Sequence, residues 1–430
     1  MQYLTENLLK KSYLCTFKKN TIVQNKRKIV NDPVWGFINI PSAFHYDLMQ
    51  HPYFQRLNRI KQMGLACLVY PGAQHTRLQH SLGAMFLTNE AVKQIRSQGH
   101  EITNEEADAV LAAILLHDIG HGPFSHALEN ALMTDISHEE ISIIMMKQIN
   151  REMDGKLDMA LSIFNNEYPK KFLHQLLSGQ LDMDRLDYLS RDSFFSGVIE
   201  GNIGSARIIK MLNVKDDRLV VEAKGIYSIE QFLIARRLMY WQVYLHKTAF
   251  AAETMLNKIL ARAKELASKN VELFASPAFR YFLYNNVTGN EIGSNPEALK
   301  NYALLDDSDL ISAIKVWASH PDTVLSTLSE NFINRKLFKI KITENPVGET
   351  KIKEDLQYYV QKYRISEDDA QYFVSKDIVS SDFYRAEDEN IVILYNNGST
   401  KDICEASDLL DMSALSKTIE KHYYCYLKIS

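Results

Sequence analysis

The fold is decided by Ala109-Val110-Leu111-Ala112-Ala113-Ile114-Leu115-Leu116, which runs directly into His117-Asp118-Ile119-Gly120-His121-Gly122-Pro123. Eight consecutive apolar residues predict a helix that is apolar on every side, and such a helix is buried in a core. Thr103 followed by Glu106 is a capping pattern that starts this helix, and Gly122-Pro123 must break it. The sequence therefore predicts a helical core whose central helix ends on a His-Asp pair, which is costly to bury without strong partners.

Histidine is concentrated around this stretch. Seven of the 13 histidines fall between residues 75 and 138, where uniform scatter would place about two. Histidine is the commonest metal ligand and is suited to acid/base chemistry near neutral pH. The cluster predicts a site, and the alternative is a group of unrelated core and surface histidines.

The overall composition excludes several classes of protein. In 430 residues, 46% are hydrophobic and 24% charged, which argues against disorder. The net charge of −4 gives no electrostatic footprint for nucleic acid or an anionic membrane. The four cysteines are far apart and form no CxxC, so neither a disulfide scaffold nor a thiolate zinc site is expected. No signal peptide or apolar run of the ~20 residues needed to cross a bilayer is present, which predicts a soluble, cytoplasmic protein.

Periodicity gives a mainly α fold class with small β-hairpins and an α+β C-terminal region. Three segments are expected: a β-containing entry over 1–45, a helical core over 46–268, and the C-terminal region over 269–430. Helices are predicted over 77–97 and from 104, and one long helix over 227–268. Hairpins are predicted over 28–40 and 211–223, with further strands over 337–342 and 391–395.

Four residues are the candidate metal ligands: His80, His117, Asp118 and Asp184. Two imidazoles and two carboxylates form a mixed N/O set that suits Zn, Mn, Fe, Co or Ni better than a Mg or Ca cage. A metal held in this way keeps open positions for water and substrate. The alternative is a satisfied buried His-Asp pair, with His80 and Asp184 unrelated to it.

The order His80…His117-Asp118…Asp184 resembles the H…HD…D pattern of the HD-domain metal-dependent phosphohydrolases. Three longer blocks are more specific, and they are similar to the deoxynucleoside triphosphate (dNTP) triphosphohydrolase branch of that family. They run from Tyr70 to Gly83, from His117 to His126 and from Asp184 to Asp192. The resemblance covers residues 28–270 clearly and implies an HD-domain helical core.

Roles for further residues follow from that resemblance. It implies that His121 lines the site beside the metal and that His126 protonates the leaving 5′ oxygen. Glu129 would orient His126, and His138 would be the second catalytic histidine.

The resemblance also implies a set of substrate contacts. Phosphate contacts fall on Arg77, Arg185, Arg236, Tyr240, Tyr244 and Lys247, and ribose contacts on Gln62, Tyr188 and Asp192. Tyr188 would exclude a 2′-hydroxyl, and Asp192 would accept the 3′-hydroxyl. Steps of four, four and three place Arg236, Tyr240, Tyr244 and Lys247 on one helical face.

The sequence departs from the family pattern at several of these positions. Arg185 replaces a lysine and Tyr240 replaces a histidine. At the guanine-nucleotide activator site of the vertebrate enzyme, Gln55 and Arg56 persist, but Gln50 and Asn58 replace its acid and one arginine, so activation by GTP is unsupported.

The resemblance implies a metal-dependent dNTP triphosphohydrolase, with additional Mg accompanying the triphosphate, that forms a homo-oligomer, either a dimer or a tetramer. One alternative is another HD phosphohydrolase, acting on nucleoside monophosphates, cyclic nucleotides or guanosine polyphosphates. The other is a nucleotide-binding regulator with a vestigial site. No membrane partner is expected, and nucleic acid is not indicated.

Overall fold

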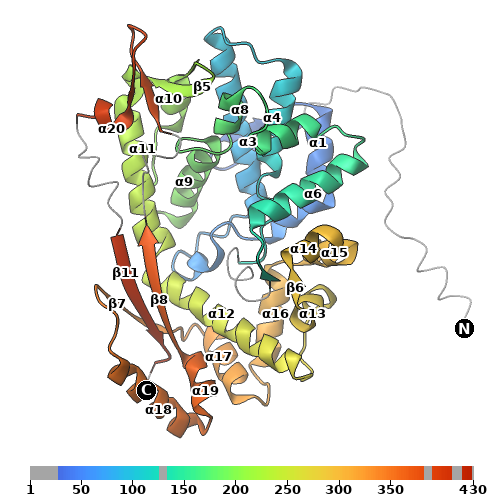
Figure 1. The fold of residues 1–430 in the computed structure, drawn as a ribbon, viewed down its shortest axis with the longest axis vertical. Coiled ribbons are helices and arrows are strands. Elements are labelled where there is room, and N and C mark those ends of the chain that lie inside the picture. Colours follow the sequence, from blue (N-terminus) through green and yellow to red (C-terminus); the bar gives the residue numbers. More distant parts are fainter. Residues whose placement is uncertain (1–27, 125–132, 382–389, 409–418, 429–430) are drawn as a thin grey trace, which may run out of the picture.

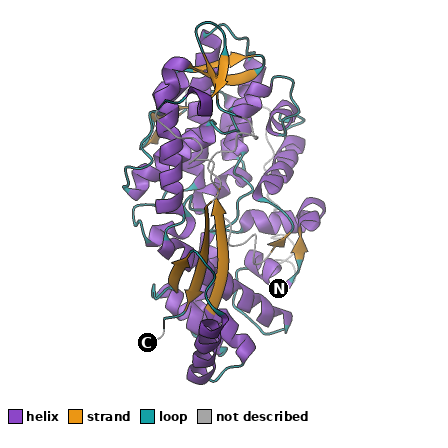
Figure 2. Ribbon diagram, turned by 60° about the vertical axis from the view of Figure 1, so that its left-hand side comes forward, coloured by secondary structure: helices purple, strands orange, loops and turns teal. Residues whose placement is uncertain are grey.

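The computed structural model describes residues 28–124, 133–381, 390–408 and 419–428 (Figure 1). The fold is mainly helical with small sheets, as predicted (Figure 2). The first helices are α1 (Ala43–Gln50), α2 (Pro52–Gln55), α3 (Arg77–Ser97), α4 (Asn104–Leu116), α6 (His138–Glu152), α7 (Asp158–Phe164), α8 (Lys171–Gln175), α9 (Met183–Ser196) and α10 (Ser205–Lys210). The later helices are α11 (Ile226–Met239), α12 (Lys247–Ser268), α13 (Pro277–Tyr284), α14 (Gly289–Ser294), α15 (Pro296–Leu304), α16 (Asp307–Trp317), α17 (Thr323–Ile333), α18 (Glu349–Tyr363), α19 (Glu367–Ala370) and α20 (Ile403–Ala406).

The strands of the described residues form four small sheets. β1 (Ile29–Asp32) and β2 (Gly36–Asn39) make the predicted N-terminal hairpin, and β4 (Leu212–Lys215) and β5 (Arg218–Glu222) make the second. β9 (Val392–Leu394) pairs parallel with β5 and antiparallel with β10 (Thr400–Asp402). β11 (Ile419–Tyr426) lies between β7 (Lys339–Thr343) and β8 (Val374–Ser381), and β3 (Met133–Thr134) pairs with β6 (Val287–Thr288).

The central helix α4 begins and ends as the sequence predicts. Thr103 caps it and accepts a hydrogen bond from the amide of Glu106, whose side chain bonds back to Thr103. Every residue from Ala109 to Leu116 is buried, and α4 packs against α1, α3 and α7. The His117-Asp118 pair therefore lies at the end of a helix whose orientation is fixed by packing on its neighbours.

The C-terminal region does not form a separate core. Buried apolar residues from Ile38 to Leu427 belong to one cluster, and β9 extends the β4–β5 hairpin from the other end of the chain. In Figure 1 the red C-terminal strands lie in two places, one beside β5 and the other, β11, next to β8. The division of the chain near residue 268 stays a prediction.

One helix differs from the expectation. The predicted continuous helix over 227–268 is wrong, because α11 passes into a π-helical turn at Tyr240–Tyr244 before α12 begins at Lys247. The turn contains neither glycine nor proline, so no local signal marks it. Among the described residues, no helix is long and apolar enough to cross a membrane.

Because α4 is buried in the core, its packing contributes strongly to the stability of the fold. Ile114 is fully buried, so we expect Ile114→Ala to lower the free energy of unfolding by about 2–5 kcal/mol. Val316, which is 49% exposed on α16, is the control, and Val316→Ala should change it by less than about 1 kcal/mol. Urea unfolding measures both, and equal effects would contradict the buried position of Ile114.

Candidate metal centre

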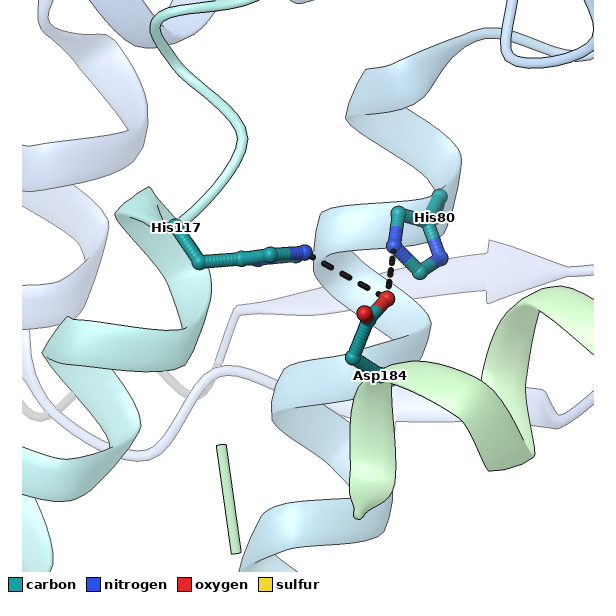
Figure 3. Close-up of side chains that lie close together, drawn as sticks. All are labelled: His80, His117 and Asp184. Atoms are coloured by element: carbon teal, nitrogen blue, oxygen red, sulfur yellow. Dashed lines mark ion pairs between the residues drawn. The ribbon is translucent and has the colours of Figure 1, made fainter. Parts of the chain in front are cut away.

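Three helices bring together a cluster of possible metal ligands, of which His80 is buried and His117 and Asp184 are half-buried. His80 lies in the first turn of α3, His117 caps the end of α4, and Asp184 lies in the first turn of α9. One ligand atom from each residue lies within 4.8 Å of the other two. Oδ1 of Asp184 is 2.9 Å from Nε2 of His80 and 3.5 Å from Nε2 of His117 (Figure 3).

The hydrogen bonds of the two imidazoles prepare them for a metal. Nδ1 of His117 lies 2.6 Å from the carbonyl oxygen of Ile114, and Nδ1 of His80 lies 2.8 Å from Oδ2 of Asp187. Both partners can only accept, so each Nδ1 carries a proton and each Nε2 is the nitrogen left to bind a metal. Neither Nε2 has a well-aligned hydrogen bond among the described residues. The donor set thus fits a divalent transition metal.

Asp118 lies at the edge of this cluster. Its Oδ1 is 3.2 Å from Nε2 of His117 and 3.3 Å from Nε2 of His121, and its Oδ2 accepts a hydrogen bond of 2.6 Å from Arg77. Burial raises the pKa of Asp118, but the neighbouring His117, His121 and Arg77 outweigh burial and hold that pKa well below its usual range. Asp118 is therefore an ionised carboxylate beside the cluster, and its role as a metal ligand stays a prediction.

Asp187 supports His80 from behind, and the sequence analysis missed it. Besides His80, its carboxylate accepts hydrogen bonds from Nε1 of Trp35 at 2.5 Å and from Nε of Arg191 at 2.8 Å. Arg191 in turn donates to Asp32 at 2.7 Å, which ties the β1–β2 hairpin to the metal ligand. The sequence did contain a signal for Asp187, because it lies three residues after Asp184 in a carboxylate-rich helix and so shares a helical face with it.

The histidines beside the cluster have distinct surroundings. The rings of His121 and His138 stack at 3.8 Å with an interplanar angle of 18°. Burial and the charge of Arg77 lower the pKa of His121 to about 3, so it is neutral near pH 7. The predicted acid His126 and its partner Glu129 lie outside the described residues, and their roles stay predictions.

An aromatic and acidic wall lies on the other side of His80. The ring of Tyr188 is 6.4 Å from that of His80 and 6.2 Å from that of Tyr244. Asp192 is held from two sides, by Nε2 of His75 at 2.7 Å and by the hydroxyl of Tyr244 at 2.8 Å. His75 is a second residue that the sequence analysis did not place, although it belongs to the histidine cluster.

Two of the other predicted contacts, Arg185 and Arg236, lie within electrostatic reach of Tyr188. Arg236 donates to Gln180 at 2.8 Å, and Arg185 forms an ion pair with Asp182. The side-chain oxygen of Gln62 is buried with no hydrogen-bond partner among the described residues, which leaves it available to a ligand.

Lys247 is the exception among the predicted substrate contacts. The prediction that Arg236, Tyr240, Tyr244 and Lys247 share one helical face is wrong, because the π-helical turn interrupts the helix between them. Tyr240 lies in that turn with its ring 5.7 Å from Trp241. Lys247 lines a cavity of about 710 Å³ together with Arg335, Lys339 and Lys362, and none of the metal-cluster residues lines it.

Comparison with known proteins agrees with this geometry. The HD domain family model matches residues 77–192, which contain all four predicted ligands, and the HD associated region model matches residues 203–276. An uncharacterised protein of Bacillus subtilis is 32% identical over 93% of this chain and 92% of its own length. The chain belongs to the HD-domain family.

A solved structure and a named relative refine the HD assignment. A phosphohydrolase from Bacteroides thetaiotaomicron is 59% identical with a TM-score of 0.92, over 94% of this chain and all of the other. A Dictyostelium discoideum protein named as a deoxynucleoside triphosphate triphosphohydrolase SAMHD1 homolog is 30% identical over 55% of this chain and 50% of its own length. This HD protein is thus a metal-dependent phosphohydrolase of a dNTPase-like family.

The HD site predicts a defined pH dependence of metal binding. Burial lowers the pKa of His80, but Asp184 and Asp187 outweigh it and raise that pKa to about 10 in the metal-free protein. His80 is then protonated at pH 7, and metal must displace this proton. Metal affinity should therefore rise with pH between 6 and 9, by about tenfold per unit for each proton displaced. Calorimetry in buffers of different ionisation enthalpy measures the protons released, and zero release with pH-independent affinity would contradict this account.

Gly83 tests the support of His80 by Asp187. A Cβ atom at Gly83 would lie 1.9 Å from Oδ1 of Asp187 and 2.2 Å from a guanidinium nitrogen of Arg191. We expect Gly83→Ala to displace the carboxylate and weaken metal binding by about 10–100-fold, as the loss of an outer-shell partner does. Gly293→Ala is the control, because its Cβ would meet only Ile144 at an ordinary 3.6 Å. Metal titration of both variants decides, and equal affinities would rule out this role for Asp187.

Proposed function

We propose that the protein is a dNTP triphosphohydrolase that converts a dNTP into a deoxynucleoside and tripolyphosphate. The observation that carries the proposal is the wall formed by Tyr188, Tyr244 and Asp192 directly beside the metal cluster. An aromatic ring next to a fixed carboxylate suits a deoxyribose, whose apolar C2′ edge packs on the ring while its 3′-hydroxyl donates to the acid. The named SAMHD1 relatives support the same substrate.

The reaction is a water-driven cleavage at the α-phosphate. Water attacks the α-phosphorus, the bond to the 5′ oxygen breaks, and the deoxynucleoside leaves with a proton on that oxygen. His80, His117, Asp118 and Asp184 would hold a divalent metal, which would supply Lewis acidity and lower the pKa of the attacking water. Arg77 and Arg236 stabilise the negative charge that develops on the phosphate, and His126, oriented by Glu129, protonates the leaving oxygen. His121 and His138 line the site beside it.

Other parts of the proposal concern the bound substrate and the assembly. Gln62 contacts the ribose, Arg185 and Tyr240 contact phosphate, and Mg accompanies the triphosphate. Homo-oligomerisation and a cytoplasmic location also belong to the proposal.

The products distinguish this function from the alternatives. With Mn, Co or Mg, we expect each accepted dNTP to yield nucleoside and tripolyphosphate, separable by ion-exchange chromatography. His117→Ala removes a ligand and should lower turnover by at least about 100-fold. Hydrolysis of monophosphates, cyclic nucleotides or guanosine polyphosphates, with dNTPs left intact, would point to another HD phosphohydrolase. Binding of dNTP without turnover would point to a regulator.

Tyr188 tests how the sugar is selected. Its ring would occupy the space that a 2′-hydroxyl needs, so Tyr188→Ala should reduce the preference for dNTP over NTP in kcat/KM by about tenfold or more. Tyr188→Phe keeps the ring and should keep the preference. An unchanged preference in Tyr188→Ala would remove Tyr188 from sugar selection.

A further inference from the structure

The backbone of residues 117–124, here called the HD turn, is tied down from several sides. Within α6, the hydroxyl of Ser142 donates to the carbonyl oxygen of His117 at 2.7 Å and accepts from the amide of Gly120 at 2.9 Å. The HD turn is the segment that presents His117, Asp118 and His121 to the metal cluster. What fixes this backbone therefore fixes ligand geometry.

Arg56 binds the backbone of the HD turn through its guanidinium group. Its guanidinium is fully buried and donates one pair of hydrogen bonds to the carbonyl oxygens of Ile119 at 2.9 Å and His121 at 2.6 Å. A second pair, at 3.3 and 3.2 Å, goes to the carbonyl oxygens of Tyr302 and Leu305. Arg56 thus joins the HD turn to the junction between α15 and α16. Its burial also removes it from the surface, where the family resemblance had matched it to an activator site.

The α15–α16 junction reaches the HD turn through two side chains of its own. The hydroxyl of Tyr302 donates to the carbonyl oxygen of Gly120 at 2.7 Å. Asp307 accepts from the amide of Phe124 at 3.0 Å with one carboxylate oxygen and from the amide of Lys61 at 3.0 Å with the other. Tyr302 and Asp307 thus bond to the HD turn at its middle, Gly120, and at its last residue, Phe124.

Phe124, the last residue of the HD turn, has an unusual backbone conformation. It is a buried residue other than glycine with a φ of +51°, in the left-handed region that side chains disfavour. Such a conformation persists only where the surroundings determine it, and it is concentrated at functional sites. Its amide donates a hydrogen bond to Asp307, which contributes to holding this conformation.

Arg56 and Asp307 are charged residues that hold the backbone of the HD turn. Both residues are buried, and neither has a charged partner within 4 Å among the described residues. Burying an unpaired charge is costly, so an apolar core would be easier to build here. What the charges provide is strong, directional hydrogen bonds to backbone groups. That is a positioning role.

We propose that Arg56, Tyr302 and Asp307 are positioning residues of the metal centre, and that the α15–α16 junction is thereby part of the catalytic architecture although it lies outside the HD domain match. They act through the backbone of the HD turn and touch neither metal nor substrate. This inference rests on the proposed metal-dependent function of the cluster, but not on the identity of the substrate.

The test compares two neighbouring carboxylates in the full-length protein. Asp307→Asn keeps the size of the side chain, but its one carbonyl oxygen can accept from only one of the two amides, and its NH₂ group meets the other. Asp306→Asn removes the same charge one residue earlier, where the acid caps α16 and pairs with the half-exposed Arg59 at 2.7 Å. Asparagine caps helices as well as aspartate does, so this is the matched control.

Binding of Co²⁺, followed by its visible absorption spectrum, is the readout, because the spectrum reports ligand geometry and does not depend on turnover. We expect Asp307→Asn to bind Co²⁺ at least about tenfold more weakly and with an altered spectrum. Asp306→Asn should stay within about twofold of wild type. If Asp307→Asn binds Co²⁺ with wild-type affinity and spectrum, the proposal is overturned.

Two further results separate the proposals from each other. If Asp307→Asn does not fold, as judged by its thermal unfolding, Tyr302→Phe decides, since it removes one hydroxyl only. A shifted spectrum there supports positioning, and a wild-type spectrum overturns it. A wild type that binds Co²⁺ but leaves every dNTP intact refutes the dNTPase function alone, whereas a wild type that binds no Co²⁺ refutes both.

Discussion

Two imidazole nitrogens and a carboxylate oxygen converge in the protein interior at the meeting point of α3, α4 and α9. Nδ1–H of His117 donates to the carbonyl oxygen of Ile114, and Nδ1–H of His80 donates to Asp187, so Nε2 of each ring faces Asp184. In the metal-free protein the proton on His80 offsets the charge of Asp184, and a bound divalent metal would displace that proton and take its place between the three atoms. The rest of the structure holds this arrangement in place.

Successive parts of the chain contribute to that support. The apolar helix α4 positions His117 through core packing and the hydrogen bond of its ring to Ile114. Asp187 positions His80 through a network that reaches Trp35 and Asp32 in the N-terminal hairpin. The HD turn is fixed by buried polar side chains from α6, from Arg56 and from the α15–α16 junction. The metal centre therefore draws on residues from position 32 to position 307, and the C-terminal region is not a mere appendage to the catalytic core.

The sequence predicted what has a local cause. The helix over 104–116 has its cap and its apolar run within a few residues, and His80, His117 and Asp184 were found by their order and residue types. Tyr302 and Asp307 gave no signal, because their role depends on contacts with residues more than 180 positions away. The π-helical turn at Tyr240–Tyr244 was missed for a similar reason. It contains no helix-breaking residue, so the interruption of the helix, and with it the position of Lys247, could not be predicted.

The most direct measurement of the central claim is anomalous X-ray scattering from crystals grown with Mn²⁺ or Co²⁺. The account predicts one strong peak per chain, between Nε2 of His80, Nε2 of His117 and the carboxylate of Asp184, with Asp118 turned toward it. A peak elsewhere in the molecule, or density at the cluster without anomalous signal, would contradict it.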